Sequence, residues 1–94
     1  MMHFDLTTDS NGAVTSVSLT YPATQSYENG VAYVYNRSLG VGVIQQISAN
    51  GSIGPTPPVA ARLNDQLVIS VENDMQTVST CVLLGNGIAA GYCP

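Results

Sequence analysis

The sequence predicts an all-β protein, an antiparallel β-sandwich of seven to eight short strands. Val, Ile and Thr make up 24 of the 94 residues, whereas lysine is absent and glutamate occurs twice, so strand-favouring residues far outnumber exposed-helix formers. No window of about a dozen residues has the apolar spacing of an amphipathic helix. Turn-forming residues recur at intervals of about eight to twelve positions, which is typical of sandwiches and small barrels.

The turns define where the strands begin and end. The dipeptide Asn-Gly occurs four times, at residues 11–12, 29–30, 50–51 and 86–87, and both residues tolerate the positive φ of a hairpin turn. Further breaks fall at residues 38–42, 54–58, 64–65 and 73–74. We therefore expect strands, in chain order, at residues 3–8, 13–20, 31–37, 41–48, 59–62, 66–72, 77–84 and 88–93.

Apolar residues alternate along several of these strands. In the second, Val17, Leu19 and Tyr21 share one face, and in the sixth the shared face carries the apolar side chains of residues 67, 69 and 71. One face of each of these strands should pack in the core, and the other should be exposed to solvent. Before the fifth strand, residues 54–58 contain three prolines, which lack N–H donors for a ladder, so this segment is predicted to be an edge crossover between sheets.

Length and charge exclude several classes of protein. A chain of 94 residues leaves room for one domain, spanning residues 1–94. Six acids against two arginines give a net charge of −4, which disfavours nucleic acid and polybasic membrane contacts. No apolar run reaches the roughly 18 residues of a membrane-spanning helix, and the first residues lack the pattern of a signal peptide.

Catalytic and metal-binding patterns are weak in this sequence. His3 is the only histidine and stands near the N-terminus, where we expect it to be exposed rather than part of a nucleophilic triad. One histidine and two cysteines do not fill a four-ligand zinc site. The side chains near residues 64–65 and 73–74 offer the oxygen ligands that calcium prefers, but Asx turns account for the same pattern. We expect no enzyme, no metal and no cofactor.

Cys81 and Cys93 flank the last Asn-Gly turn almost symmetrically. If residues 77–84 and 88–93 form a hairpin, a strict two-residue loop places Cys81 opposite Tyr92, whereas a three-residue loop or a bulge places it opposite Cys93. We favour a disulfide, because small secreted sandwiches often need a covalent cross-link. Two buried free thiols are the alternative.

Residues 32–84 resemble the bacterial immunoglobulin-like domains that occur in tandem on large surface and secreted proteins. The resemblance is carried by the strand Ala-Tyr-Val-Tyr-Asn at 32–36, the strand and turn at 47–53, and the long segment at 59–73. Asn64-Asp65 stands where that family usually has Gly-Asp, and residues 74–76 stand where it often has a Gly-Asn turn. The resemblance implies an immunoglobulin-like β-sandwich with a modular, non-catalytic spacer or adhesive role.

Long uncharged stretches suggest self-association. No charged residue occurs between Ser38 and Ala61 or from Met75 to the end, and native sheets usually place charges, lysine above all, on exposed edges. Either these strands are central, or copies of the chain or adjacent modules cover them. We predict a structural subunit of a fibre, array or adhesin, extracellular or at the cell surface, with segments 41–47 and 78–88 as its contacts. The predicted assembly surface comprises Val41, Val43, Ile47, Val78, Val82, Leu84 and Ile88.

The tyrosines support a second hypothesis, a module that recognises carbohydrate or a protein partner. Tyr33 and Tyr35 are two residues apart and share one face of a strand. Aromatic faces stack on sugars and anchor protein interfaces, so this pair is a candidate ligand platform. A core role for both tyrosines is the alternative.

Overall fold

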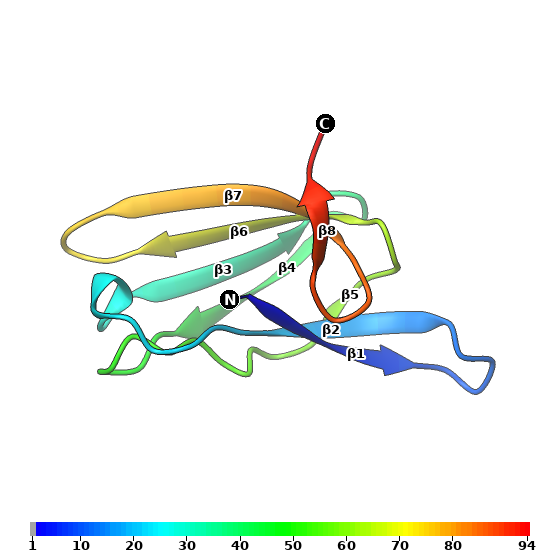
Figure 1. The fold of residues 1–94 in the computed structure, drawn as a ribbon, viewed down its shortest axis with the longest axis horizontal. Coiled ribbons are helices and arrows are strands. Elements are labelled where there is room, and N and C mark those ends of the chain that lie inside the picture. The colour runs from blue at the N-terminus through cyan, green and yellow to red at the C-terminus, as the bar shows by residue number, and fades with distance from the viewer. Residues whose placement is uncertain (1) are drawn as a thin grey trace.

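Two antiparallel sheets form the protein in the computed structural model, which describes residues 2–94 (Figure 1). The all-β sandwich predicted from sequence is confirmed, and no predicted strand end is displaced by more than two residues. A short 3-10 helix, η1, precedes the third strand. The strands are β1 (His3–Thr8), β2 (Val14–Thr20), β3 (Val31–Asn36), β4 (Val41–Gln46), β5 (Val59–Ala60), β6 (Gln66–Glu72), β7 (Thr77–Leu84) and β8 (Ala89–Tyr92), and η1 spans Gln25–Tyr27.

The smaller sheet has the order β1-β2-β5 and the larger one the order β4-β3-β6-β7-β8. In Figure 1, β3, β6 and β7 run side by side above β1 and β2, whereas β8 turns steeply across the direction of β7. The β1–β2 turn projects from one end of the molecule. Each sheet therefore has two edges: β1 and β5 in the smaller sheet, β4 and β8 in the larger one.

The core lies between the sheets and is built by alternation along the strands. The predicted inward faces of β2 and β6 are confirmed, since Val17 and Leu19 are buried, as are Leu67, Ile69 and Val71. Other strands contribute in the same way. The buried apolar residues are Phe4, Val17, Leu19, Ala32, Val34, Ile47, Ile53, Val59, Ala61, Leu67, Ile69, Val71, Val82 and Leu84.

An irregular segment, residues 53–61, extends the smaller sheet along β2. Ile53 bridges to Tyr21 at its start, and Val59 pairs with Val17 at its end. Between them Thr56 accepts a hydrogen bond from the Leu19 amide on its Oγ1, 2.9 Å away, and donates its own N–H to the Leu19 carbonyl at 3.0 Å. The prolines of this segment lie exposed at the edge, as the sequence predicted.

Two of the Asn-Gly turns show why glycine is needed there. Gly12 in the β1–β2 turn and Gly51 in the turn after β4 both have φ of +84°, a conformation that other residues rarely adopt. Gly51 is also buried, and a Cβ on it would collide with the backbone of Thr24. Around Gly12 nothing lies within 4 Å of that position.

Asn36 is fully buried at the end of β3 and uses every polar group of its side chain. Its Nδ2 donates to the Ala60 carbonyl at 2.9 Å and to Asp65 Oδ2 at 2.8 Å. Its Oδ1 accepts from the amides of Ser38 at 2.9 Å and Leu39 at 3.1 Å. Because Ala60 belongs to the smaller sheet, one amide group ties the two sheets together and shapes the β3–β4 turn.

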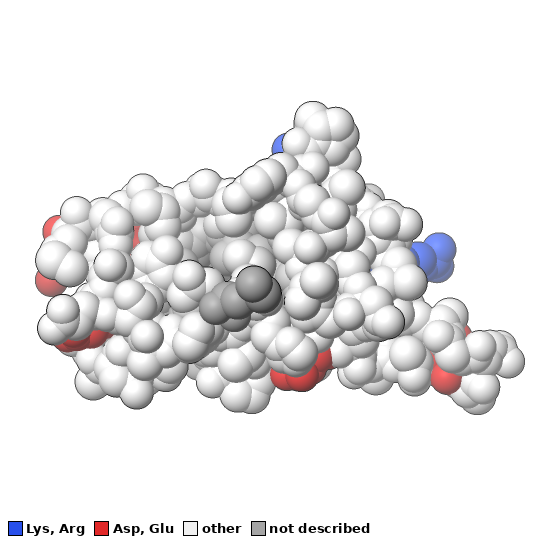
Figure 2. All heavy atoms as spheres, in the orientation of Figure 1, with Lys and Arg blue, Asp and Glu red and all other residues white. Residues whose placement is uncertain are grey.

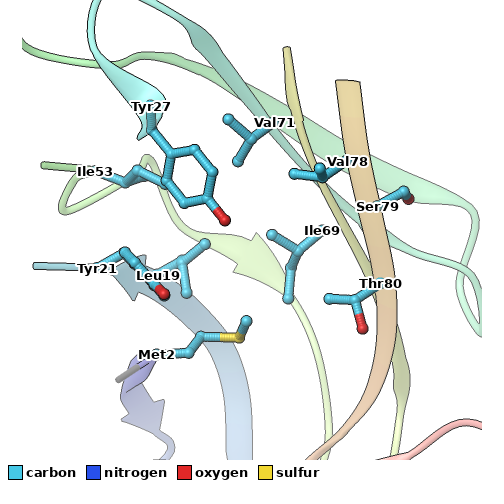
Figure 3. A pocket seen from close by; sticks show the side chains of 10 residues that line it. All are labelled: Met2, Leu19, Tyr21, Tyr27, Ile53, Ile69, Val71, Val78, Ser79 and Thr80. Atoms are coloured by element: carbon cyan, nitrogen blue, oxygen red, sulfur yellow. The ribbon is translucent and has the colours of Figure 1, made fainter. Parts of the chain in front are cut away.

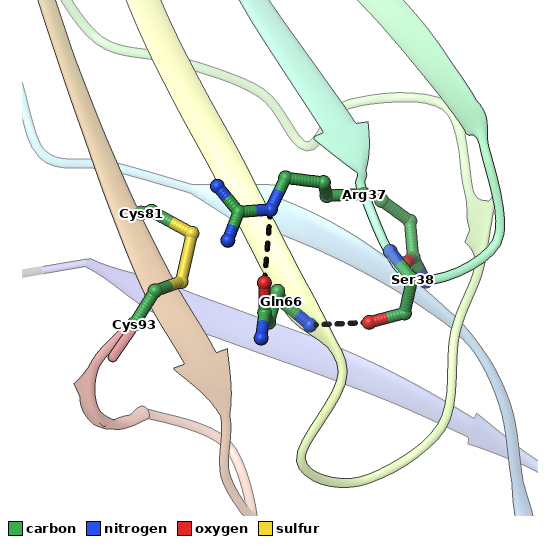
Figure 4. The surroundings of a disulfide bond; sticks show 6 residues. Arg37, Ser38, Gln66, Cys81 and Cys93 are labelled. Atoms are coloured by element: carbon green, nitrogen blue, oxygen red, sulfur yellow. Dashed lines mark hydrogen bonds between the residues drawn. A yellow bond between two sulfur atoms is a disulfide. The ribbon is translucent and has the colours of Figure 1, made fainter.

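A disulfide joins Cys81 to Cys93 and fastens the chain after β8 to β7 (Figure 4). The pairing of Val82 with Tyr92, a register shift at Leu83/Leu84 and a bond from the Cys93 amide to the Cys81 carbonyl place the cysteines side by side. The predicted disulfide is confirmed, and the hairpin contains the bulge rather than being a strict two-residue-loop hairpin.

Replacing Asn36 with alanine should lower the free energy of unfolding by about 3 kcal/mol, because it removes four hydrogen bonds and leaves buried partners unsatisfied. Urea denaturation followed by circular dichroism measures the change. Asn11→Ala is the control, since Asn11 is exposed, and its effect should stay within about 0.5 kcal/mol. Equal, small losses in both variants would contradict the role of Asn36 in joining the sheets.

Replacing both cysteines with alanine should cost about 3 kcal/mol, because the bond closes a loop with a sequence separation of 12 and restricts the unfolded chain. Hydrogen exchange should rise in β8 more than in β3, since β8 loses its covalent attachment. The measurement is denaturation of the oxidised protein, the reduced protein and the double variant. Unchanged stability after complete reduction would show that the disulfide contributes nothing to the fold.

Candidate interaction surface

The charged side chains leave a large part of the surface free of charge. In Figure 2 the acidic side chains lie at the two ends and along the lower margin of the face shown, and the area between them carries no charge. β4 and β8, the two edge strands of the larger sheet, contain no charged residue. β1, by contrast, carries His3 and Asp5, whose Nε2 and Oδ1 atoms are 3.1 Å apart and exposed.

The predicted assembly surface is wrong at three positions. Ile47, Val82 and Leu84 have exposed fractions of 1%, 4% and 0%, so they belong to the core and present almost no surface to another molecule. The reason is strand alternation: Val82 pairs with the inward-facing Leu67, and Leu84 lies two residues further along β7 on the same face. Ile47 follows β4 and donates its N–H to the carbonyl of Gly30.

The remaining predicted positions lie at opposite edges of the larger sheet. Val41 is exposed and Val43 half-buried on β4, while Val78 and Ile88 are exposed near β7 and β8. The predicted surface is therefore two separate surfaces rather than one.

The first surface, here called the β4 patch, consists of the exposed apolar side chains on and beside β4: Tyr35 and Ile44 on the outer face of the sheet, Leu39 in the β3–β4 turn, and Val41 on the opposite face of the strand. Ile44 is 64% exposed and is the most exposed of the four. Ile44 lies opposite Tyr33 in the β3–β4 ladder, and Tyr35 lies opposite Gly42, so these side chains share the outer face of the sheet. Sequence reasoning missed Ile44, although alternation along 41–47 places it on the face opposite to Val41 and Val43.

The second surface is a hollow where the sandwich opens beside β7 (Figure 3). It holds about 160 Å³ and has a floor of Leu19, Ile53, Ile69 and Val71. Met2, Tyr21 and Tyr27 lie around it, and the two tyrosine rings are 5.7 Å apart at a tilt of 54°. A second hollow shares Met2 and Thr80 with the first and continues to Ile88 and Tyr92.

The residues that line these two hollows offer contact surface rather than acid–base chemistry. None of them is acidic, basic or histidine, and the cysteines are absent from both linings. Apolar burial against another molecule is the interaction that such a lining supports. The two hollows and the β4 patch are therefore uncharged surfaces at the two sides of the larger sheet.

The candidate ligand platform lies on the surface. Tyr33 and Tyr35 point away from the core, because the neighbouring Ala32, Val34 and Asn36 occupy the inward positions of β3. Tyr35 is 44% exposed and Tyr33 is half-buried. Both tyrosines are therefore available to a ligand or a neighbouring molecule, and the core alternative is wrong.

At the two turns that suggested calcium, the side chains of Asn73 and Asp65 accept hydrogen bonds from nearby backbone amides. Asn73 Oδ1 accepts hydrogen bonds from the amides of Met75 and Gln76, both at 3.0 Å, which is an Asx turn. Asp65 Oδ2 accepts from the Arg62 amide at 2.9 Å as well as from Asn36. Within residues 2–94, no three His, Cys, Asp or Glu side chains gather where they could share a metal ion.

Comparisons with models of protein families, with curated protein sequences and with solved structures give no match to this chain. Across residues 2–94, no helix has the length and apolar character that crossing a membrane requires.

Proposed function

We propose that this protein is a non-enzymatic structural subunit or module of an extracellular or cell-surface assembly, such as a fibre, an array or an adhesin. Copies of the chain, or adjacent modules, associate through the uncharged surfaces of the larger sheet. The observation that carries the proposal is the β4 patch, where four exposed apolar side chains adjoin a free strand edge without a charged residue on that strand.

Strand order supports an immunoglobulin-like fold for this subunit. β1, β2 and β5 follow the order of strands A, B and E in immunoglobulin sandwiches, and β4, β3, β6 and β7 follow the order C′, C, F and G. β8 is an additional strand at the edge of the second sheet. The disulfide joins neighbouring strands of one sheet, unlike the inter-sheet bond of antibody domains.

Energetics favour many weak contacts rather than one tight pair. The side chains of the β4 patch are 41% to 64% exposed, and burying them contributes roughly 1 kcal/mol each. Hydrogen bonds along a strand edge add about 1 kcal/mol each. Because association costs about 4–15 kcal/mol, a single contact is weak, and an assembly in which each copy makes several contacts gains from avidity.

The disulfide supports an extracellular or cell-surface location. Disulfides persist in oxidising compartments and are rare where glutathione keeps thiols reduced. Cys81 and Cys93 form such a bond on the sheet surface, beside the hydrogen bond from Arg37 Nε to Gln66 Oε1 of 2.9 Å (Figure 4). A small subunit outside the cell would be stabilised by this cross-link.

Ile44→Lys should shift the protein toward monomer at concentrations where the unaltered chain associates, because a lysine at an edge opposes strand addition. Light scattering coupled to size-exclusion chromatography over a wide concentration range measures the mass. Thr7→Lys is the matched control, since Thr7 is an exposed strand residue at an edge of the other sheet and should leave association unchanged. Monomer behaviour of the unaltered chain at every concentration would contradict the proposed function.

A carbohydrate- or protein-recognition module is the second candidate function, and the outward position of Tyr33 and Tyr35 favours it. Two aromatic rings on one sheet face offer a stacking surface for a sugar or an anchor for a protein partner.

The double variant Tyr33→Ala/Tyr35→Ala should keep its fold, because neither ring is in the core, whereas Val34→Ala should lower the free energy of unfolding by about 2 kcal/mol. Thermal denaturation measures both variants. Screening of the folded double variant and the unaltered chain on a glycan array then tests recognition. A glycan bound equally by both proteins would rule out the tyrosines as its platform.

A further inference from the structure

Three of the four sheet edges carry features that oppose pairing with another strand. β1 displays the charged Asp5 beside His3, has a register shift at Thr7/Thr8, and donates its Phe4 amide to the Gly87 carbonyl at 2.9 Å. The edge that ends in β5 contains exposed prolines between residues 54 and 58. Charge, bulges, and proline without an N–H all block strand addition.

The β8 edge is protected in another way. This strand has four residues, a register shift at Leu83/Leu84, and a disulfide directly after its last residue. It also turns steeply from the direction of β7 (Figure 1). A short, bulged and turned strand presents few aligned backbone groups to a partner.

β4 lacks all of these features. Its six residues, Val41–Gln46, pair with β3 without a register shift, and the strand contains no proline and no charged residue. Its outer edge therefore presents a regular row of backbone donors and acceptors. Within the described part of the chain, β4 offers the longest regular open edge, since the stretch of β7 that β8 leaves unpaired covers only residues 77–81, beside the hollow.

We propose that β4 pairs antiparallel with β4 of a second copy of this chain, around a two-fold axis that places Ile44 opposite Ile44 of that copy. This inference rests on the proposed function, because it specifies which surface mediates one of the contacts in the assembly. The pairing joins two five-stranded sheets into one continuous sheet, and it leaves the hollows beside β7 and β8 free for a different contact.

Charge argues for a second copy as the occupant. The chain carries a net charge of −4, so two copies repel each other wherever their acids face. The β4 edge avoids this repulsion, since neither the strand nor the exposed side chains of the β4 patch are charged. An antiparallel strand edge is also complementary to itself, which a closed two-fold contact requires.

The register follows from alternation. Directly opposed residues in an antiparallel pair point to the same face. A two-fold axis near the centre of β4, where the paired stretch is longest, therefore sets either Ile44 opposite itself or Val43 opposite itself. The first arrangement brings together two side chains that are 64% exposed and places Gly42 opposite Gln46 of the second copy. The second places Ile44 opposite Gly42, which has no side chain to pack against it.

Cysteine cross-linking tests this register. Both natural cysteines are in the disulfide, so an introduced cysteine is the only free thiol. Ile44→Cys should form a covalent dimer under mild air oxidation, because opposed Cβ atoms lie about 5 Å apart. Gln46→Cys is the matched control on the same face of the strand, and its two copies would be about 13 Å apart. Thr7→Cys controls for random collisions.

The outcomes separate the inference from the proposed function. Rapid cross-linking of Ile44→Cys, at least tenfold faster than Gln46→Cys and Thr7→Cys, supports the β4 contact. Association seen by light scattering without selective cross-linking at Ile44 overturns the β4 contact and leaves the proposed function standing. A chain that stays monomeric at every concentration, and cross-links no faster at residue 44 than at residue 7, overturns both.

Discussion

The position of the two sheets depends on the buried side-chain amide of Asn36. The hydrophobic effect that packs the core between the sheets is not directional. The hydrogen bonds of Asn36 are directional, and they fix β3 against Ala60 of the smaller sheet and against Asp65 at the start of β6. A buried amide of this kind is stabilising only while all of its partners are in place.

The same amide determines where β4 begins. Its Oδ1 accepts from two backbone amides of the β3–β4 turn, and the Asn36 carbonyl accepts from the Gly40 amide at 2.7 Å. The turn therefore adopts a single hydrogen-bonded conformation. β4 pairs with β3 in register along all six of its residues. Because the turn is anchored by the buried Asn36, the start of β4 is held by hydrogen bonds to the core.

The strands could be predicted from sequence because turn residues are local signals. Asn-Gly pairs and prolines act through their own φ angles, so they indicate strand ends without knowledge of the rest of the fold. The disulfide could also be predicted from sequence, since the prediction required only a hairpin and a choice between two registers. The structure confirmed the bulged register, which the chain could not specify by residue spacing alone.

The surface was harder to predict than the strands. The residue type alone does not tell whether a valine, isoleucine or leucine faces the core or solvent. For this reason Ile47, Val82 and Leu84 were predicted to be exposed although they are buried. Asn36 was missed because its partners Ala60 and Asp65 are 24 and 29 residues away, beyond any local pattern. Long-range polar contacts become visible only when the sheets are assembled.

The two glycine turns differ in how much sequence change they tolerate. Gly51 is buried against the backbone of Thr24, so no side chain fits at that position, although residues 48–50 of the same turn are exposed. The turn at Gly12 projects from the end of the sandwich with open space around it (Figure 1). A peptide tag or epitope grafted there would be displayed away from both the core and β4, which makes this hairpin tip the natural site for engineering the protein as a repeating scaffold.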